Sequence, residues 1–144
     1  MYKPENYQLS ELAHPKIIKA IGKKNTWRRL DAECLEDLQT IRTEWYQIHK
    51  SGIYVNRLDL GLDSRGLRPP DDTDGAFYST HKQATTFDLE PVNGLLRELY
   101  DFVIELIKSG KLKKINTLEN FKNTLKWVHV AYMNTDKMPL IIKP

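Results

Sequence analysis

The 144-residue sequence is poor in cysteine and histidine, with one cysteine and four histidines. A single cysteine, Cys34, permits neither a disulfide framework nor a cluster of thiolate ligands, so any metal ion would need nitrogen and oxygen ligands. The sequence also lacks the run of about 18 apolar residues that a membrane-spanning helix requires, and its opening, MYKPENYQL, has no hydrophobic signal core. We therefore expect a chain made in the cytoplasm, without an export signal or membrane anchor of its own.

An excess of charge of one sign is nearly absent too. The 22 Lys and Arg residues exceed the 19 Asp and Glu residues by 3, and the basic residues are scattered along the chain. So small an excess does not indicate nucleic-acid binding, although it mildly favours an anionic surface. No internal repeat, low-complexity tract or linker rich in Pro, Gly and Ser divides the sequence, so we expect one domain spanning residues 1–144.

Apolar residues recur at helical spacing in two long segments. The clearest is 30–50, where apolar positions follow one another at steps of three and four, Asp31 can cap the start and Gly52 can stop the end. The second is 90–110, an amphipathic segment that ends at a glycine. Both segments are expected to pack an apolar face against the core.

Shorter elements lie before and between these helices. A short helix is expected after Ser10, with Pro15 early in it or at a break. Alternating or β-branched residues predict strands at 53–62, 84–89 and 126–133. Because helices and strands follow one another without a regular βαβ alternation, we expect an α+β fold, a small and mostly antiparallel sheet flanked by helices.

Two histidines and one aspartate stand out on the predicted strands. His81 precedes Asp88 by seven positions, and strand alternation places His129 on the same side as Trp127 and Ala131. Two histidines, a carboxylate and an open water position are typical of catalytic zinc, which lowers the pKa of bound water toward about 7. Spacing alone is weak support, because a loop histidine followed by a capping aspartate is a frequent chance pattern.

The segment YSTHKQATTFDL, residues 78–89, resembles a known motif. It is similar to the S-x-H-x-x-G-x-A-x-D element of the zinc D-alanyl-D-alanine carboxypeptidases and L-alanyl-D-glutamate endolysins, whose fold is shared with the Hedgehog signalling domain. Ser79, His81 and Asp88 match that element in spacing.

Three further segments resemble the same family, in the same order. RGLRPP (65–70) is similar to the family's S-G-Y-R-S-P element, KWVHVAY (126–132) to the W-x-H strand that supplies the last zinc histidine, and NYQLSEL (6–12) to the F-T-L-S-E-L opening of many phage and bacterial members. The resemblance covers nearly the whole chain, and four ordered elements are far more specific than any one of them.

The resemblance implies a phage-type zinc peptidase that hydrolyses a peptide bond of the peptidoglycan stem peptide. His81, Asp88 and His129 would hold Zn²⁺, Arg68 would bind carboxylate or carbonyl oxygens of the substrate, and Ser79 would support His81. The expected partner is the peptidoglycan peptide, with neither nucleic acid nor membrane. Without an export signal, the protein would reach the wall after lysis or as part of a phage particle.

The sequence departs from the family at three positions. Ala84 replaces the motif glycine, Thr86 replaces the motif alanine, and Lys126 stands where many members carry the glutamate that accepts a proton from the zinc-bound water. Lysine is a poor base at neutral pH unless its pKa is strongly lowered. Glu119, ten positions before His129, is the candidate base instead, with a solvated glutamate in a polar turn as the alternative.

Two other interpretations remain open at the sequence level. The departures suit a non-catalytic relative that serves as a cell-wall-binding or particle-assembly module. The other interpretation is a metal-free α+β scaffold for protein partners, in which His81 and Asp88 merely close a loop. The sequence does not decide which bond is cut, which divalent metal is used, or the oligomeric state.

Overall fold

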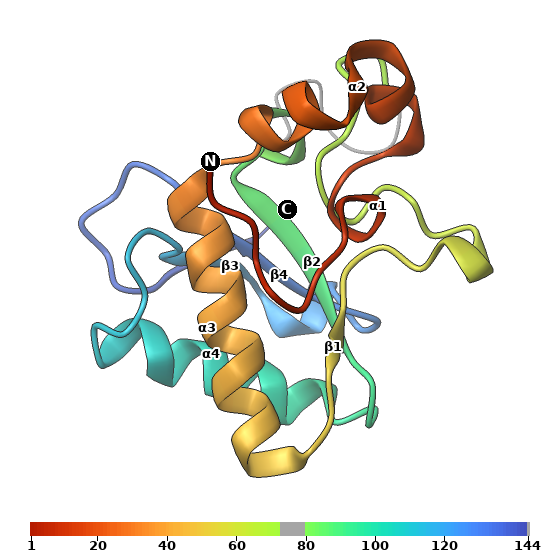
Figure 1. The fold of residues 1–144 in the computed structure, drawn as a ribbon. Coiled ribbons are helices and arrows are strands. Elements are labelled where there is room, and N and C mark those ends of the chain that lie inside the picture. Colours follow the sequence, from red (N-terminus) through yellow and green to blue (C-terminus); the bar gives the residue numbers. More distant parts are fainter. Residues whose placement is uncertain (73–79, 144) are drawn as a thin grey trace.

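The computed structural model describes residues 1–72 and 80–143. Within these residues, four α-helices and a five-stranded mixed sheet form an α+β fold (Figure 1). The helices are α1 (Leu9–Leu12), α2 (Pro15–Arg29), α3 (Ala32–His49) and α4 (Leu96–Lys108). The strands are β1 (Ile53–Tyr54), β2 (Thr86–Pro91), β3 (Thr117–Glu119), β4 (Val128–Ala131) and β5 (Leu140–Ile142).

The sheet has the strand order β1-β2-β4-β3-β5. The pairings of β1 with β2, β2 with β4 and β3 with β4 are antiparallel, whereas β3 pairs with β5 in parallel. The predicted α+β class is therefore confirmed. The sheet is mostly but not purely antiparallel.

Helix α3 closely follows its predicted range. The side chain of Asp31 accepts a hydrogen bond from the backbone N–H of Cys34 at 3.0 Å, as the capping prediction requires. The helix ends at Lys50, which adopts a left-handed backbone (φ 51°), before the predicted stop at Gly52. Its apolar face is buried in the core: Cys34, Leu35, Leu38, Ile41 and Trp45.

Contrary to the prediction, the first helix does not start after Ser10. Ser10 lies inside α1, which begins after Gln8, and the backbone N–H of Gln8 donates to Glu11 Oε2 at 2.7 Å. Pro15 opens a second helix, α2, where its missing N–H costs nothing because first-turn N–H groups have no partner within the helix.

The predicted strand 53–62 is mostly wrong. Only its first two residues are extended, and a 3₁₀ turn, η1 (Leu58–Leu60), follows. The backbones of Arg57 and Leu62 hydrogen-bond to each other across this turn, and Gly61 supplies a left-handed conformation (φ 71°). The chain therefore turns back where alternation suggested a continuous strand.

The second helix also starts later than expected. Residues up to Pro91 belong to β2, and a turn with Gly94 at φ 76° precedes α4. Val92 and Leu95, which lie before α4, are 48% and 39% exposed. Within α4 the apolar face packs against the core, as predicted.

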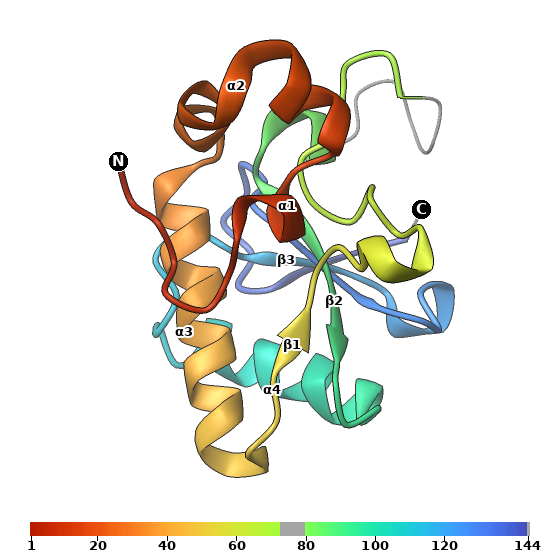
Figure 2. The same cartoon turned by 45° about the vertical axis from the view of Figure 1, so that its right-hand side comes forward.

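The sheet separates the helical core from the candidate site. Helices α3 and α4 pack together, and α4 contacts β2 and β4. Side chains from three strands are fully buried in that core: Phe87, Leu89, Leu118, Val128 and Val130. The 3₁₀ turn η1, which follows β1, lies on the side of β2 away from α3, as Figure 2 shows. None of the described helices is both long and apolar enough to cross a membrane.

Candidate metal centre and adjoining pocket

Asp88 and His129 face each other across two neighbouring strands. In the antiparallel register of β2 and β4 they are direct partners, so their side chains lie on one face of the sheet. Alternation sends Phe87 and Leu89 into the core and leaves Asp88 on the opposite face. His129 Nδ1 lies 2.9 Å from Asp88 Oδ1.

His81 reaches the same carboxylate from outside the sheet. It lies on the 3₁₀ helix η2 (Thr80–Gln83), immediately before β2, and is almost fully buried. Its Nδ1 lies 3.0 Å from the carbonyl oxygen of Gly66 and its Nε2 lies 3.3 Å from Asp88 Oδ2. Because a carbonyl oxygen only accepts, Nδ1 donates its proton to Gly66, and Nε2 faces the carboxylate.

The loop around Gly66 holds His81 in place. Gly66 packs so closely on α1 that a Cβ there would overlap the carbonyl oxygen of Leu12, which accepts a hydrogen bond from Leu67 at 2.8 Å. The backbone N–H of Arg68 donates to the carbonyl oxygen of His81 at 3.2 Å. Close packing on α1 therefore explains why position 66 is glycine, as it is in the resembled motif.

Glu119 adjoins the cluster on its other side. The β3–β4 register pairs Thr117 with Ala131 and Leu118 with Val130, so its continuation sets Glu119 opposite His129. Glu119 Oε2 lies 3.6 Å from His129 Nδ1. The geometry thus brings the candidate base to the cluster, whereas Lys126 is exposed.

Asp88 is the electrostatic centre of this group. Burial raises the pKa of its carboxyl, but the charge of His81 and hydrogen bonds from His129 and His81 outweigh burial, so the pKa falls below its usual range. Arg68 adds a further positive charge, with Nη2 at 3.6 Å from Asp88 Oδ2 and Nε donating to the carbonyl oxygen of Ser64. Asp88 is therefore a carboxylate at neutral pH.

The three predicted ligands fit a divalent metal ion. Donor atoms of His81, Asp88 and His129 all lie within 4.8 Å of one another. Zinc bonds of about 2.1 Å at tetrahedral angles separate neighbouring ligand atoms by about 3.4 Å, close to the 3.3 Å between His81 Nε2 and Asp88 Oδ2. Two imidazoles and a carboxylate suit zinc, although other first-row metals accept the same donors.

A pocket of about 270 Å³ opens beside Asp88. Arg68 and Asp88 line it together with two residues that the sequence analysis assigned no role, Arg65 and Trp127. Arg65 is nearly buried, forms an ion pair with Glu90, and has its guanidinium carbon 5.8 Å from the centre of the Trp127 ring. Two features of the sequence could have pointed to them: Arg65 directly precedes Gly66, and Trp127 lies two residues before His129.

Comparison of the chain with protein-family models, curated proteins and solved structures found no match. The family resemblance therefore rests on the quoted motifs alone. Of the predicted site residues, the structure brings together Arg68, His81, Asp88, Glu119 and His129. Ser79 lies outside the described residues.

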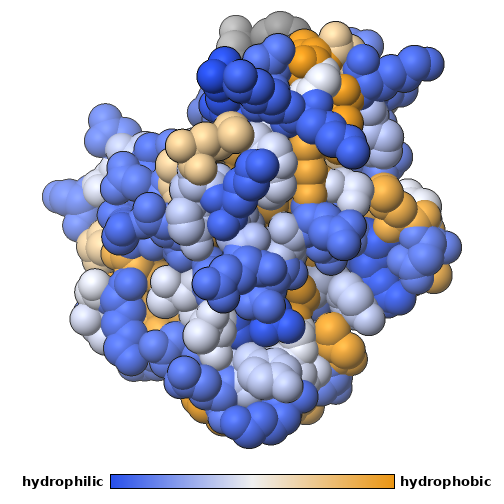
Figure 3. All heavy atoms as spheres, in the orientation of Figure 1, coloured by the Kyte–Doolittle hydropathy of each residue, from blue (hydrophilic) through white to orange (hydrophobic). Residues whose placement is uncertain are grey.

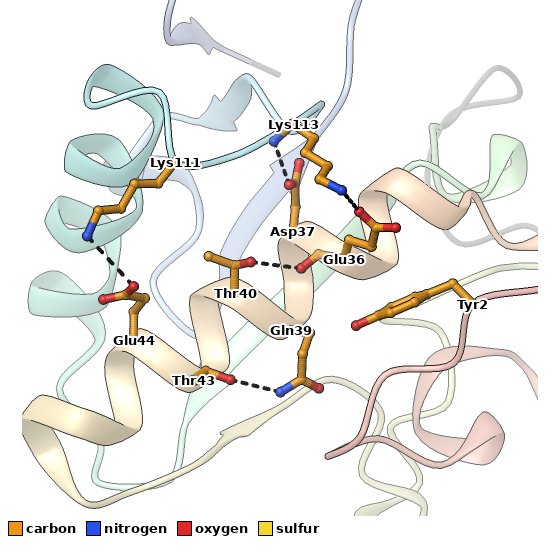
Figure 4. Close-up of a pocket in the computed structure, with 9 residues that line it drawn as sticks. All are labelled: Tyr2, Glu36, Asp37, Gln39, Thr40, Thr43, Glu44, Lys111 and Lys113. Atoms are coloured by element: carbon orange, nitrogen blue, oxygen red, sulfur yellow. Dashed lines mark hydrogen bonds and ion pairs between the residues drawn. The ribbon is translucent and has the colours of Figure 1, made fainter.

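Another pocket, of about 340 Å³, runs along α3 on the helical side of the molecule (Figure 4). Two ion pairs line it, Lys111 with Glu44 and Lys113 with Glu36. None of the residues lining it is a histidine or a cysteine, and in the described ranges 1–72 and 80–143 the His81 cluster is the one group with metal-ligand geometry. The metal-ligating side chains therefore favour the pocket beside Asp88 as the candidate functional site.

Proposed function

We propose that this chain is a zinc peptidase with the Hedgehog/DD-peptidase fold, and that it hydrolyses a peptide bond of the peptidoglycan stem peptide. One observation carries the proposal. His81, Asp88 and His129 come from η2, β2 and β4, and they are the same three residues that the ordered sequence motifs identify. Chance motif matches give no reason for three such side chains to converge in a buried cluster.

His81, Asp88 and His129 would hold the zinc ion. When bound there, zinc supplies Lewis acidity to the scissile carbonyl and to the attacking water. Glu119 accepts a proton from that water as its oxygen bonds to the carbonyl carbon. It then passes the proton to the amide nitrogen as the carbon–nitrogen bond breaks, so that a carboxylic acid and an amine are released.

The pocket beside Asp88 would hold the substrate. The side chain of Arg68 is 13% exposed and is fixed at Nε by the Ser64 carbonyl oxygen, so its guanidinium is positioned in advance. Fixed guanidinium groups bind carboxylate or carbonyl oxygens in a fork. Trp127 and Arg65 supply a flat wall. The delivery route inferred from the sequence, lysis or a phage particle, stays a prediction.

Metal content and activity test this function together. Protein purified without added zinc should contain close to one zinc per chain by mass spectrometry and should release muropeptides from purified peptidoglycan. His81→Ala should abolish both. His49→Ala is the matched control, since His49 stacks on Trp45 at a ring distance of 3.7 Å and belongs to no metal cluster. Normal release by a metal-free preparation would refute the proposal.

A non-catalytic wall-binding or particle-assembly module is the second candidate. It is favoured by Thr86, which replaces the family alanine on the same face of β2 as Asp88 and is 1% exposed. This candidate requires zinc and peptidoglycan binding without release of fragments. The enzyme instead requires turnover that Glu119→Gln abolishes while zinc binding persists.

A further inference from the structure

Helix α2 concentrates the positive charge of the chain. Residues 15–29 contain six Lys and Arg residues and no Asp or Glu, a net charge of +6. The whole chain carries +3, and subtracting +6 leaves −3 for the rest. Six of the 22 basic residues therefore lie on this one helix without an acidic residue among them: Lys16, Lys19, Lys23, Lys24, Arg28 and Arg29.

These six side chains are exposed. None of them forms an ion pair within the described residues. Three lysines before β3 do have acidic partners, since Lys111, Lys113 and Lys114 pair with Glu44, Glu36 and Asp31. The charge on α2 is thus available to a partner, whereas charge near β3 is already compensated.

The helix presents this charge as a strip over two helical segments. Gly22 (φ 80°, ψ 161°) breaks α2 between them, and each segment carries basic residues. In Figure 1 the helix lies at one end of the molecule, and Figure 3 shows hydrophilic side chains there, with some hydrophobic ones among them. Six like charges on one element match several successive charges of a polymer better than one small anion.

We propose that α2 binds a flexible polymer with a phosphodiester backbone. Lysine and arginine strips bind such polymers by neutralising phosphates and releasing counterions. Insertion into a membrane does not fit, because Ile17 of the helix is buried in the protein and Ile21 is the single exposed large apolar side chain of α2. Base stacking does not fit either, because the aromatic residue of α2, Trp27, is partly buried against the core, with Lys3 above its ring.

The strip begins next to the candidate site. Lys16 lines a pocket of about 370 Å³ together with Asp63 and Ser64. Asp63 and Ser64 also line the pocket beside Asp88. A polymer held on α2 would therefore anchor the protein with its candidate site against the same anionic material. The anchor needs neither zinc nor catalysis, so it stands or falls apart from the proposed function.

Charge reversal on α2 tests the proposal with synthetic poly(glycerol phosphate) as the probe. For the wild type, the affinity measured by biolayer interferometry should fall on the order of 10- to 100-fold between 50 and 200 mM salt. Lys23→Glu/Lys24→Glu should weaken binding at least tenfold at the lower salt concentration. The matched control is Lys108→Glu/Lys137→Glu, which makes the same change in net charge at two exposed lysines outside α2 and should bind within about twofold of wild type.

Circular dichroism melting first confirms that both double variants fold. An equal loss of binding in the two variants would overturn the proposal, because net charge would then explain it. Tighter binding to a single-stranded oligonucleotide or to vesicles of anionic phospholipid than to poly(glycerol phosphate) would overturn it as well. Selective loss in the α2 variant, with the polymer as the preferred probe, supports it.

Discussion

Ala84 adopts a backbone conformation that favours glycine. Its φ of 64° is left-handed, a conformation that suits glycine and costs other residues about 1 kcal/mol or more. It is the position at which the resembled motif has glycine. The turn between His81 and β2 thus carries a residue that strains it.

Ala84→Gly should therefore stabilise the protein, because relief of the strain outweighs the extra chain entropy of glycine in the unfolded state. We expect a gain of about 0.5–1 kcal/mol in the free energy of unfolding, measured by urea denaturation. Ala20→Gly is the control, since Ala20 is exposed within α2 and should lose about 1 kcal/mol. A loss of stability in Ala84→Gly would contradict this reading of the turn.

Gly66→Ala should have the opposite effect. The added methyl group would overlap the Leu12 carbonyl oxygen, which forces α1 and the loop apart. We expect a loss of about 3 kcal/mol in the free energy of unfolding, together with weaker zinc binding because the Gly66 carbonyl oxygen orients His81. Gly110→Ala, with nothing near its Cβ but a φ of 74°, controls for strain without overlap and should leave zinc binding unchanged.

At the scale of elements, Asp37 of α3 fixes the approach to β3. It is 1% exposed, and its carboxylate accepts hydrogen bonds from the backbone N–H groups of Lys113, Lys114 and Ile115 at 2.6, 2.7 and 2.7 Å. The strand that follows ends with Glu119. A buried side chain on a helix thus sets the position of the candidate base.

Asp37→Asn should cost about 3 kcal/mol in the free energy of unfolding. The amide offers one accepting oxygen where the carboxylate offers two, and charge-assisted bonds are lost. Glu44→Gln, which removes one partly exposed ion pair with Lys111, should change stability by less than about 0.5 kcal/mol. Equal effects of the two changes in chemical denaturation would show that the three backbone bonds contribute little.

Elements with strong local patterns were predictable from the sequence, and elements defined by distant pairing were not. The periodicity of α3 and the Asp31 cap are local, and both were predicted. Strands β3 and β5 have three residues each and owe their extended form to pairing with each other and with β4, so no pattern announced them. The turn at Gly61 interrupted a strand that alternation alone had suggested.

The candidate site was predictable only in part, because it too combines local patterns with distant pairing. Strand alternation placed His129 on a face, but only the resemblance linked it to Asp88 and His81, since their register depends on β2 and β4 pairing across an intervening helix. Arg65 was not predicted because its contacts in the pocket are with Glu90 and Trp127, which are both remote in sequence.

At the scale of the whole molecule, a metal ion would tie together segments that are far apart in the sequence. An ion that binds the folded state alone stabilises it by about 2.7 kcal/mol at 100 times its dissociation constant. For a chain of 144 residues, that gain should raise Tm by roughly 5–10 °C. A chelator should reverse the rise, and His129→Ala should show none of it in differential scanning calorimetry.

The central claim is that His81, Asp88 and His129 share one divalent ion, and calorimetric titration of the metal-stripped protein with zinc tests it most directly. We expect one zinc per chain, with binding weakened at least 100-fold in His129→Ala and unchanged in His49→Ala. Absence of zinc uptake by the folded wild-type protein, or uptake that His129→Ala leaves intact, would contradict the claim.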